Sequence, residues 1–306
     1  MKVLSITGGA TKFIQLLIAT HKILQHGYKP DDIVVKSSSA IYILPLLLGK
    51  YDQLYKEGVE LDLAKYFTVP PTNGNGKLTP LALLRAAASF LPNWMPFGAV
   101  NSFGEQDVRP LLRKYLSLEE FNRYKYGDYP NVHVVTVVTG KKDVSRVVNL
   151  KELEYEEALA NIEGSAQIQA FTAGLEIDGQ VVFDGGMFTA GAAGYLFETG
   201  YFDIEPTELV SIYSWTKYNY DLKESDAWKE NIANNSLRIS NVFKAATKWA
   251  FPRHEYWYCR ANNIKRLEVR CPDVFEHTYQ YDKATVDKAV EETTKYMNQL
   301  LSNVTF

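Results

Sequence analysis

The stretch that decides the fold runs Asp32-Ile-Val-Val-Lys-Ser-Ser-Ser-Ala-Ile-Tyr-Ile-Leu-Pro-Leu-Leu-Leu-Gly49. It begins with a short β-rich run and continues, from about Ser39 to Leu48, as an apolar run of helical character. Pro45 falls near a kink or a late turn of that helix. Three consecutive serines therefore lie where a strand turns into a helix. This order is typical of a nucleophile elbow, in which a tight turn presents one serine at a helix N-terminus.

Two glycine-containing segments lie where such a serine would need help. Gly8-Gly9-Ala10-Thr11-Lys12 follows an alternating, β-branched first strand and precedes a helix that stops near Gly27. Asp184-Gly185-Gly186 directly follows a later apolar strand. Two strands joined by a helix within so few residues predict a right-handed βαβ unit and a mainly parallel sheet.

The rest of the chain supplies further elements of an α/β fold. Strands are expected at 132–138, 181–183, 209–213 and 264–269, and an amphipathic helix closes the chain over about 286–301. We therefore expect one α/β domain over 1–306, with a largely parallel central sheet and helices on both faces. Residues 51–130 are expected to form a helical cap within it. The apolar run 78–100 is either a core helix with a packed loop or a mobile flap that contacts a membrane surface.

Composition narrows the function classes. The 306 residues have a net charge of −3, which disfavours nucleic acid as a partner. The two cysteines have no metal-ligand spacing and suggest a reducing compartment, although they could form one disulfide. No apolar run approaches the roughly 20 residues that span a bilayer. We expect a cytoplasmic protein; its oligomeric state does not follow from the sequence.

The serine needs a base and an oxyanion site. None of the five histidines lies in a glycine-flanked loop after a strand. Asp184, in contrast, directly follows an apolar strand and precedes two glycines. A Ser–Asp dyad is therefore the simpler interpretation. Taken alone, any of the three serines is also a suitable N-cap for the following helix, and Asp184 before two glycines is also typical of an ordinary turn. Gly8-Gly9 with Lys12 could also cradle a phosphate, although the segment lacks the endings of a P-loop or a dinucleotide fingerprint.

Together the three segments resemble those of the patatin-like phospholipase family. Gly8-Gly9-Ala10-Thr11-Lys12 matches the family's oxyanion loop, Lys36-Ser37-Ser38-Ser39-Ala40 its Gly-x-Ser-x-Gly elbow, and Asp184-Gly185-Gly186 its aspartate segment. The stretch Gly164-Ser165-Ala166-Gln167-Ile168 and the hairpin residues Ile177-Asp178-Gly179 resemble the parts that precede this aspartate. The likeness covers about residues 1–215.

This resemblance implies a fold related to cytosolic phospholipase A2 and a serine lipid acyl hydrolase of phospholipase A or esterase type, without metal or cofactor. Ser38 would be the nucleophile and Asp184 the base. Gly8, Gly9 and Ala10 would form the oxyanion hole. Lys12, Lys36 and Gly185 would face a lipid or another acyl-ester substrate.

The chain departs from the family pattern at the elbow, where Lys36 and Ala40 replace both glycines. A lysine there introduces a long side chain on a turn that is already strained, or supplies a cation for a phosphate or a developing anion. A second hypothesis is therefore a catalytically inactive patatin-like fold that binds lipid or a protein. A third is a phosphate-binding α/β protein that uses Gly8, Gly9 and Lys12.

Overall fold

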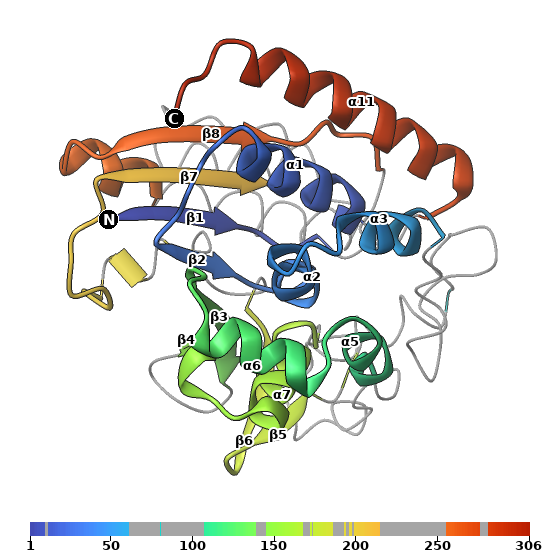
Figure 1. Ribbon diagram of the computed structural model, residues 1–306, viewed down its shortest axis with the longest axis vertical. Helices are drawn as coiled ribbons and strands as arrows, with labels where there is room; N and C mark the ends of the chain where they lie inside the picture. Colours follow the sequence, from blue (N-terminus) through green and yellow to red (C-terminus); the bar gives the residue numbers. More distant parts are fainter. Residues whose placement is uncertain are drawn as a thin grey trace.

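A central β-sheet organises the protein (Figure 1). The computed structural model describes residues 1–9, 12–60, 80, 107–138, 145–167, 172, 174–185, 193, 196–197, 199–214, 255–275 and 281–306. Within these residues the sheet has eight strands. They are β1 (Lys2–Ile6), β2 (Asp32–Val35), β3 (Asn131–Val138), β4 (Ser145–Asn149), β5 (Leu175–Ile177), β6 (Gln180–Asp184), β7 (Glu208–Tyr213) and β8 (Lys265–Arg270).

Most of the sheet is parallel. The order β3-β2-β1-β7-β8 is parallel throughout, whereas β4 and β6 pair with β3 in the antiparallel sense. Strands β5 and β6 form a hairpin whose turn residues Asp178 and Gly179 have φ of 53° and 69°, as a type I′ turn requires. The strands expected from the sequence are confirmed, and β4 is one that the sequence did not indicate.

Strand β3 brings two strand ends together. Its partners in β4 run along one edge from His133 to Val137. Its other edge is therefore shared, first by β2, which pairs up to Val134, and then by β6, which pairs from Thr136 onward. Because β2 is parallel to β3 and β6 is antiparallel, their carboxyl ends approach each other beside Val135. The turn after Val35 and the turn after Asp184 are thus neighbours.

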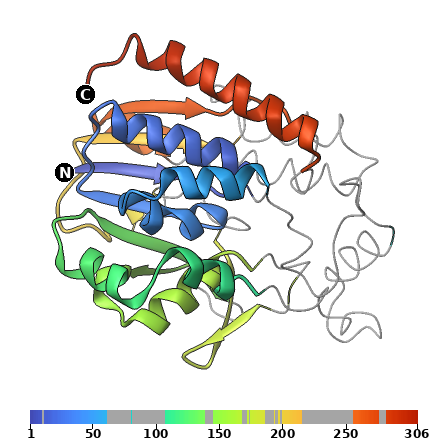
Figure 2. The same cartoon turned by 45° about the vertical axis from the view of Figure 1, so that its right-hand side comes forward.

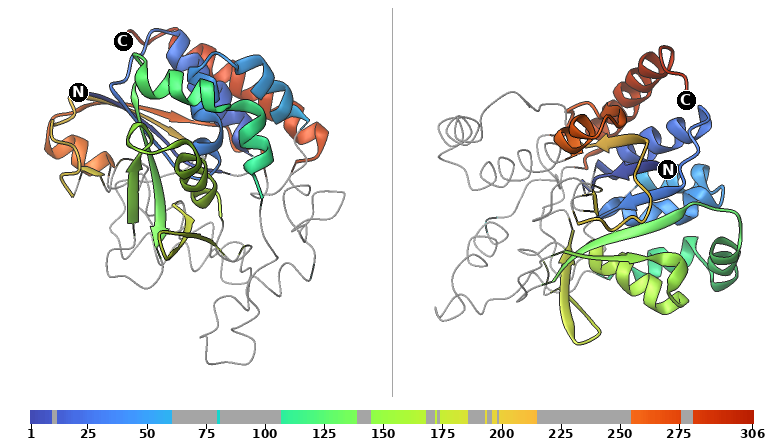
Figure 3. Two further views of the ribbon diagram at one scale, coloured as in Figure 1. Left: turned by 60° about the horizontal axis from the view of Figure 1, so that its bottom comes forward. Right: turned by 90° about the vertical axis from the view of Figure 1, so that its left-hand side faces the viewer.

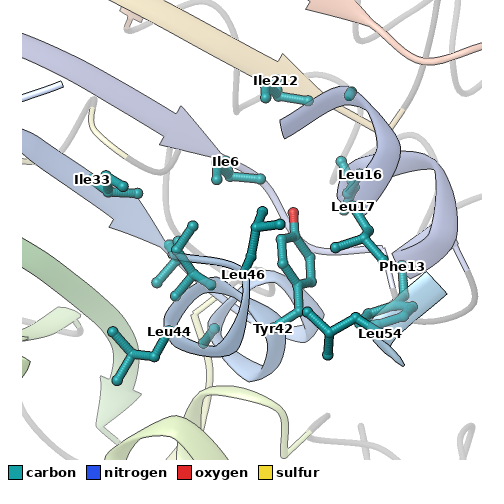
Figure 4. Close-up of a cluster of buried hydrophobic side chains, with 14 of the residues drawn as sticks. Ile6, Phe13, Leu16, Leu17, Ile33, Tyr42, Leu44, Leu46, Leu54 and Ile212 are labelled. Carbon is teal, nitrogen blue, oxygen red and sulfur yellow. The ribbon is translucent and has the colours of Figure 1, made fainter. Parts of the chain in front are cut away.

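One face of the sheet carries most of the described helices (Figures 1 and 2). They are α1 (Phe13–Gln25), α2 (Ser38–Leu47), α3 (Tyr51–Val59), α5 (Arg109–Tyr115), α6 (Leu118–Tyr126), the 3-10 turn η3 (Leu150–Glu152), α7 (Tyr155–Ser165) and α11 (Lys283–Leu301). Figure 4 shows the centre of this layer, where Tyr42 of α2 and Phe13 of α1 lie between Ile6 of β1 and Leu54 of α3. The packing holds α1 and α2, and hence their N-termini, firmly against the sheet.

The opposite face is covered by a different part of the chain. Val3, Val34, Val135 and Leu209 of the sheet pack there with residues from 193–202 and with Cys259. Residues 255–261 are helical, and Figure 3 shows this short helix in orange on the side of the sheet away from α11. The expected α/β architecture, with a mostly parallel sheet and helices on both faces, is confirmed.

The expected cap region, 51–130, is described in part. Helices α3, α5 and α6 contribute buried residues to the main core, among them Leu54, Leu112 and Phe121. The proposed flap at 78–100 lies outside the described residues except for Pro80. No helix in the described part of the chain is long and apolar enough to cross a membrane. Cys259 and Cys271 are both free thiols and both buried.

Candidate active site

The turn between β2 and α2 has the backbone of a nucleophile elbow, centred on Ser37. Ser37 has φ 57° and ψ −138°. Two other described non-glycine residues have positive φ, and both are Asp or Asn, which tolerate such conformations in turns. A serine at this φ and ψ is strained by on the order of 1–3 kcal/mol, a cost that concentrates at functional sites. The strain lies one residue before Ser38, the serine that the ungapped resemblance selects.

The three serines make different contacts. Ser37 is the N-cap of α2, yet its side chain makes no capping hydrogen bond. The hydroxyl of Ser39 is fully buried and faces the carbonyls of Lys36 and Ile6, at 2.7 and 3.1 Å. It also accepts a hydrogen bond from the Lys36 amide at 3.1 Å, so Ser39 fixes the turn. Ser38 Oγ accepts from the Gly9 amide at 3.2 Å.

The glycine loop after β1 lies directly against the elbow. A Cβ at position 8 would stand 2.1 Å from Ser37 Cβ and 2.6 Å from Ser37 Oγ, so only glycine allows this approach. The loop is held by Ser214, just after β7, whose hydroxyl donates to the Gly8 carbonyl at 2.9 Å. The Ser214 amide also donates to Thr7 Oγ1 at 3.3 Å. Gly8 and Gly9 therefore contact the elbow as expected, while Ala10 lies outside the described residues.

Lys12 is the N-cap residue of α1 and follows the glycine loop in the chain. Its side chain is buried, and its ammonium group donates to the Ser214 carbonyl at 3.0 Å and lies 3.6 Å from an oxygen of Asp273. These contacts connect the start of α1 to the end of β7. They favour a role for Lys12 in fixing the glycine loop; contact with an anionic headgroup stays a prediction.

Asp184 ends β6 at the point where that strand meets the elbow. The residue is 3% exposed, and its amide donates to the Gln167 carbonyl at 2.7 Å. A Cβ at Gly185 would stand 2.2 Å from the Val135 carbonyl oxygen, so the chain turns here only because residue 185 is glycine. The desolvation that a carboxylate base requires is therefore present at Asp184.

Ser165, the last residue of α7, links the Asp184 turn to the elbow. Its buried hydroxyl donates to the Val135 carbonyl at 2.7 Å and accepts from the Ser37 amide at 2.9 Å. Gly185 packs on the same Val135 carbonyl. The Val135 carbonyl group of β3 thus lies between the two turns. Ser165 links it to Ser37 by hydrogen bonds, and Gly185 packs directly on it.

Lys36 is buried inside the site. Its residue is 1% exposed, and its Cβ lies 3.3 Å from the position that a Cβ on Gly185 would occupy. Burial lowers the pKa of Lys36 to about 8, and the nearby Glu255 and Asp184 carboxylates act in the opposite direction. The Lys36 side chain is thus enclosed by the protein, and its contact with substrate stays a prediction.

The histidines are not near this arrangement where the structure describes them. His133 is at the start of β3 and contacts Asp32, at the start of β2, with 2.7 Å between Nε2 and Oδ1. This pair is at the opposite end of the strands from the elbow. His21 and His26 lie at the middle and end of α1, and His254 and His277 lie outside the described residues. No cluster suited to a metal ion occurs among the described residues.

Most of the predicted site residues meet at the carboxyl ends of β1, β2 and β6. The sequence interpretation missed the strain at Ser37, the contacts of Ser165 and Ser214, and the Glu255 carboxylate near Lys36. The small residues around Ser165 were a usable signal, because a small side chain at a helix end allows close approach to a neighbouring strand. Nothing in the sequence near Glu255 indicated a role.

No protein-family model matches the chain, and no curated protein matches it at a significant level. Among solved structures, the crystal structure of VipD from Legionella pneumophila is similar with a TM-score of 0.42 and 14% sequence identity. The match covers 98% of this chain and 66% of the VipD chain.

Proposed function

We propose that this protein is a serine acyl hydrolase, of phospholipase A or esterase type, that uses a Ser–Asp dyad. The observation that carries the proposal is the strained backbone of Ser37 at a strand-to-helix turn, enclosed between a glycine loop and a buried aspartate turn. Strain of this kind has no evident structural benefit here, because the Ser37 side chain does not cap α2. A nucleophile elbow requires it, since the sharp turn projects the hydroxyl away from the sheet.

Ser37 is the proposed nucleophile, in place of Ser38. Ser38 is the first residue of α2, and its hydroxyl receives the Gly9 amide. The Gly9 amide has to leave this hydroxyl before it can stabilise an oxyanion, whichever serine attacks. Ser37 instead places its Cβ and Oγ against the backbone of Gly8, so that position 8 has no room for a side chain. Ser38 remains the alternative, and the experiment below separates the two.

In the proposed reaction the Asp184 carboxylate takes the hydroxyl proton as Ser37 Oγ bonds to the ester carbonyl carbon. The carbonyl electron pair moves to oxygen, and backbone amides of the glycine loop, Gly9 and Ala10, stabilise the resulting oxyanion. Collapse breaks the bond to the alcohol oxygen, which leaves with the proton from Asp184. Water then gives a proton to Asp184 and attacks the acyl-serine. The second collapse releases the acid, and Ser37 recovers its proton.

The test is covalent labelling with a fluorophosphonate, followed by peptide mapping. Trypsin cleaves after Lys36 and Lys50, so all three serines lie in the single peptide 37–50, and fragment ions locate the adduct. We expect the label on Ser37, and we expect Ser37→Ala and Asp184→Asn to abolish it. Ser38→Ala should keep the label, because it leaves the strained residue and its aspartate unchanged.

The other outcomes are equally informative. A label on Ser38 that survives in Ser37→Ala would refute our choice of nucleophile but retain the hydrolase. A folded wild-type protein that takes no label and cleaves no phospholipid or short-chain ester would refute the hydrolase. The result would favour an inactive fold that binds lipid or a protein.

A further inference from the structure

Glu255 is a buried carboxylate that the proposed reaction does not use. It is 0% exposed, and it begins the helical residues 255–261 on the face of the sheet opposite α1 and α11. Four groups donate to it. The hydroxyls of Ser5 and Ser211 lie at 2.7 and 2.9 Å, the Ala193 amide at 2.8 Å, and the Tyr213 hydroxyl donates as well. These four donors fix the position of the Glu255 carboxylate in the core.

Lys36 lies on the same face of the sheet as this carboxylate. It directly follows β2, and the alternation of side chains along a strand gives it the direction of Val34, which belongs to the core on that face. Val34 pairs with Ser5 of β1, a donor to Glu255. On its other side Lys36 borders Gly185, next to Asp184. Lys36 is therefore enclosed between two carboxylates that come from distant parts of the chain.

We propose that Lys36 and Glu255 are positioning residues for the reaction, in which the Lys36 cation holds Asp184 ionised and Glu255 holds Lys36 charged. The effect on the reaction rests on the proposed function. The arrangement of charges rests on three side chains that are each nine-tenths buried or more. A cation beside a buried carboxylate favours its charged form, whereas a second carboxylate with no cation between them opposes it. The ionised form is the one that can accept the serine proton.

Other charged groups also face this arrangement. The Tyr213 hydroxyl, which donates to Glu255, also receives the Arg266 guanidinium of β8 at 3.1 Å. The Cys259 thiol lies near Glu255 and Arg266, and its pKa is raised to about 12, mainly by burial. The thiol therefore stays neutral over the range that matters here. Arg266 keeps its charge over that range, so Asp184, Lys36 and Glu255 are the groups to test.

The first measurement is a ¹³C NMR titration of protein labelled at the aspartate carboxyl carbon, with the Asp184 signal assigned through Asp184→Asn. In Lys36→Met we expect the Asp184 carboxyl to titrate at a pH higher by about one unit or more, a tenfold change in its ionisation. In the double variant Lys36→Met/Glu255→Gln the midpoint should return toward that of the wild type, because the like charge has gone. A structural role alone would not produce this return.

Ser5→Ala is the matched control, because it removes one donor to Glu255 and changes no charge. It should leave the Asp184 midpoint where it is. If Lys36→Met does not fold, titration of the lysine Cε signals in Glu255→Gln replaces it. Lys36 should then release its proton at a lower pH than in the wild type.

Each outcome distinguishes this proposal from the proposed function. An unchanged Asp184 midpoint in folded Lys36→Met, or no return in the double variant, would overturn the inference even if Ser37 is labelled. The expected midpoints in a protein that takes no fluorophosphonate label would support the inference about charge while the hydrolase fails. In an active enzyme, the acid limb of kcat/KM should move with the Asp184 midpoint.

Discussion

Substitution of Ser37 by glycine should stabilise the protein while removing its proposed nucleophile. At φ 57° and ψ −138° the serine is strained by on the order of 1–3 kcal/mol, and glycine adopts this conformation without strain. Against this gain, glycine loses more backbone freedom on folding, a cost of about 0.5–1 kcal/mol. Taken at the middle of both ranges, the net gain in the free energy of unfolding is about 1 kcal/mol, which corresponds to a rise in Tm of about 2 °C for a chain of this size.

Two further variants isolate the strain. Ser37→Ala removes the hydroxyl but keeps the Cβ and hence the strain, so its Tm should stay close to that of the wild type. Ser38→Gly should lower stability by about 1.5 kcal/mol, from poorer helix propensity and the lost hydrogen bond to the Gly9 amide. Substitution by glycine is thus expected to raise the free energy of unfolding at Ser37 and to lower it at Ser38.

The assay is thermal unfolding by calorimetry at one pH and one protein concentration, together with fluorophosphonate labelling of each variant. We expect the order Ser37→Gly, then the wild type and Ser37→Ala, then Ser38→Gly. If Ser37→Gly is no more stable than Ser37→Ala, Ser37 does not store backbone strain. The argument for Ser37 as the nucleophile would then lose its main support.

Two other predictions concern neighbours of Ser37. Gly8→Ala should cost about 1–3 kcal/mol and abolish labelling, because its Cβ would stand 2.1 Å from that of Ser37. Gly179→Ala is the control, because a Cβ there would have no atom within 4 Å. It should cost about 1 kcal/mol through its φ of 69° alone and keep full labelling. Equal labelling of the two variants would contradict the geometry. The pKa of Lys36 falls from 10.5 to about 8 on folding, so between these values the unfolded chain binds more protons and the Lys36 contribution to stability rises with pH. The difference in unfolding free energy between wild type and Lys36→Met, measured by urea denaturation, should therefore move in favour of the wild type from pH 8 to 10.5, and a constant difference would contradict burial of the charge.

The sequence predicted the parallel part of the sheet because its signals are local. The β-branched runs at Lys2–Ile6 and Asp32–Val35, joined by the apolar helix after Gly8-Gly9, leave few arrangements other than a βαβ unit. The antiparallel pairing of β6 with β3 has no such local signal. It depends on where β2 ends along β3, which the pattern of residues in β6 does not record.

The position of the strained turn within three identical residues could not be predicted from spacing. The ungapped comparison selects Ser38, whereas the backbone turns at Ser37. The register is set by the end of β2 at Val35 and by contacts from Ser165 and Gly8, which come from elsewhere in the chain. Alignment of short motifs can thus miss the strained turn by one position when several neighbouring residues are identical.

The burial of Lys36, the residue directly before the strained turn, has a physical explanation in Glu255. Taking an ammonium and two carboxylates out of water costs several kcal/mol per ion, and apolar residues of similar size are often as stable as a buried ion pair. Stability therefore gives little reason to bury Lys36, Asp184 and Glu255 together. The proposed reaction gives a direct reason, because Asp184 must stay ionised away from water to accept a proton. A cation fixed beside Asp184 stabilises its charge in place of solvent. The lysine directly before Ser37 and the glutamate far along the chain are then two parts of one adaptation of the site.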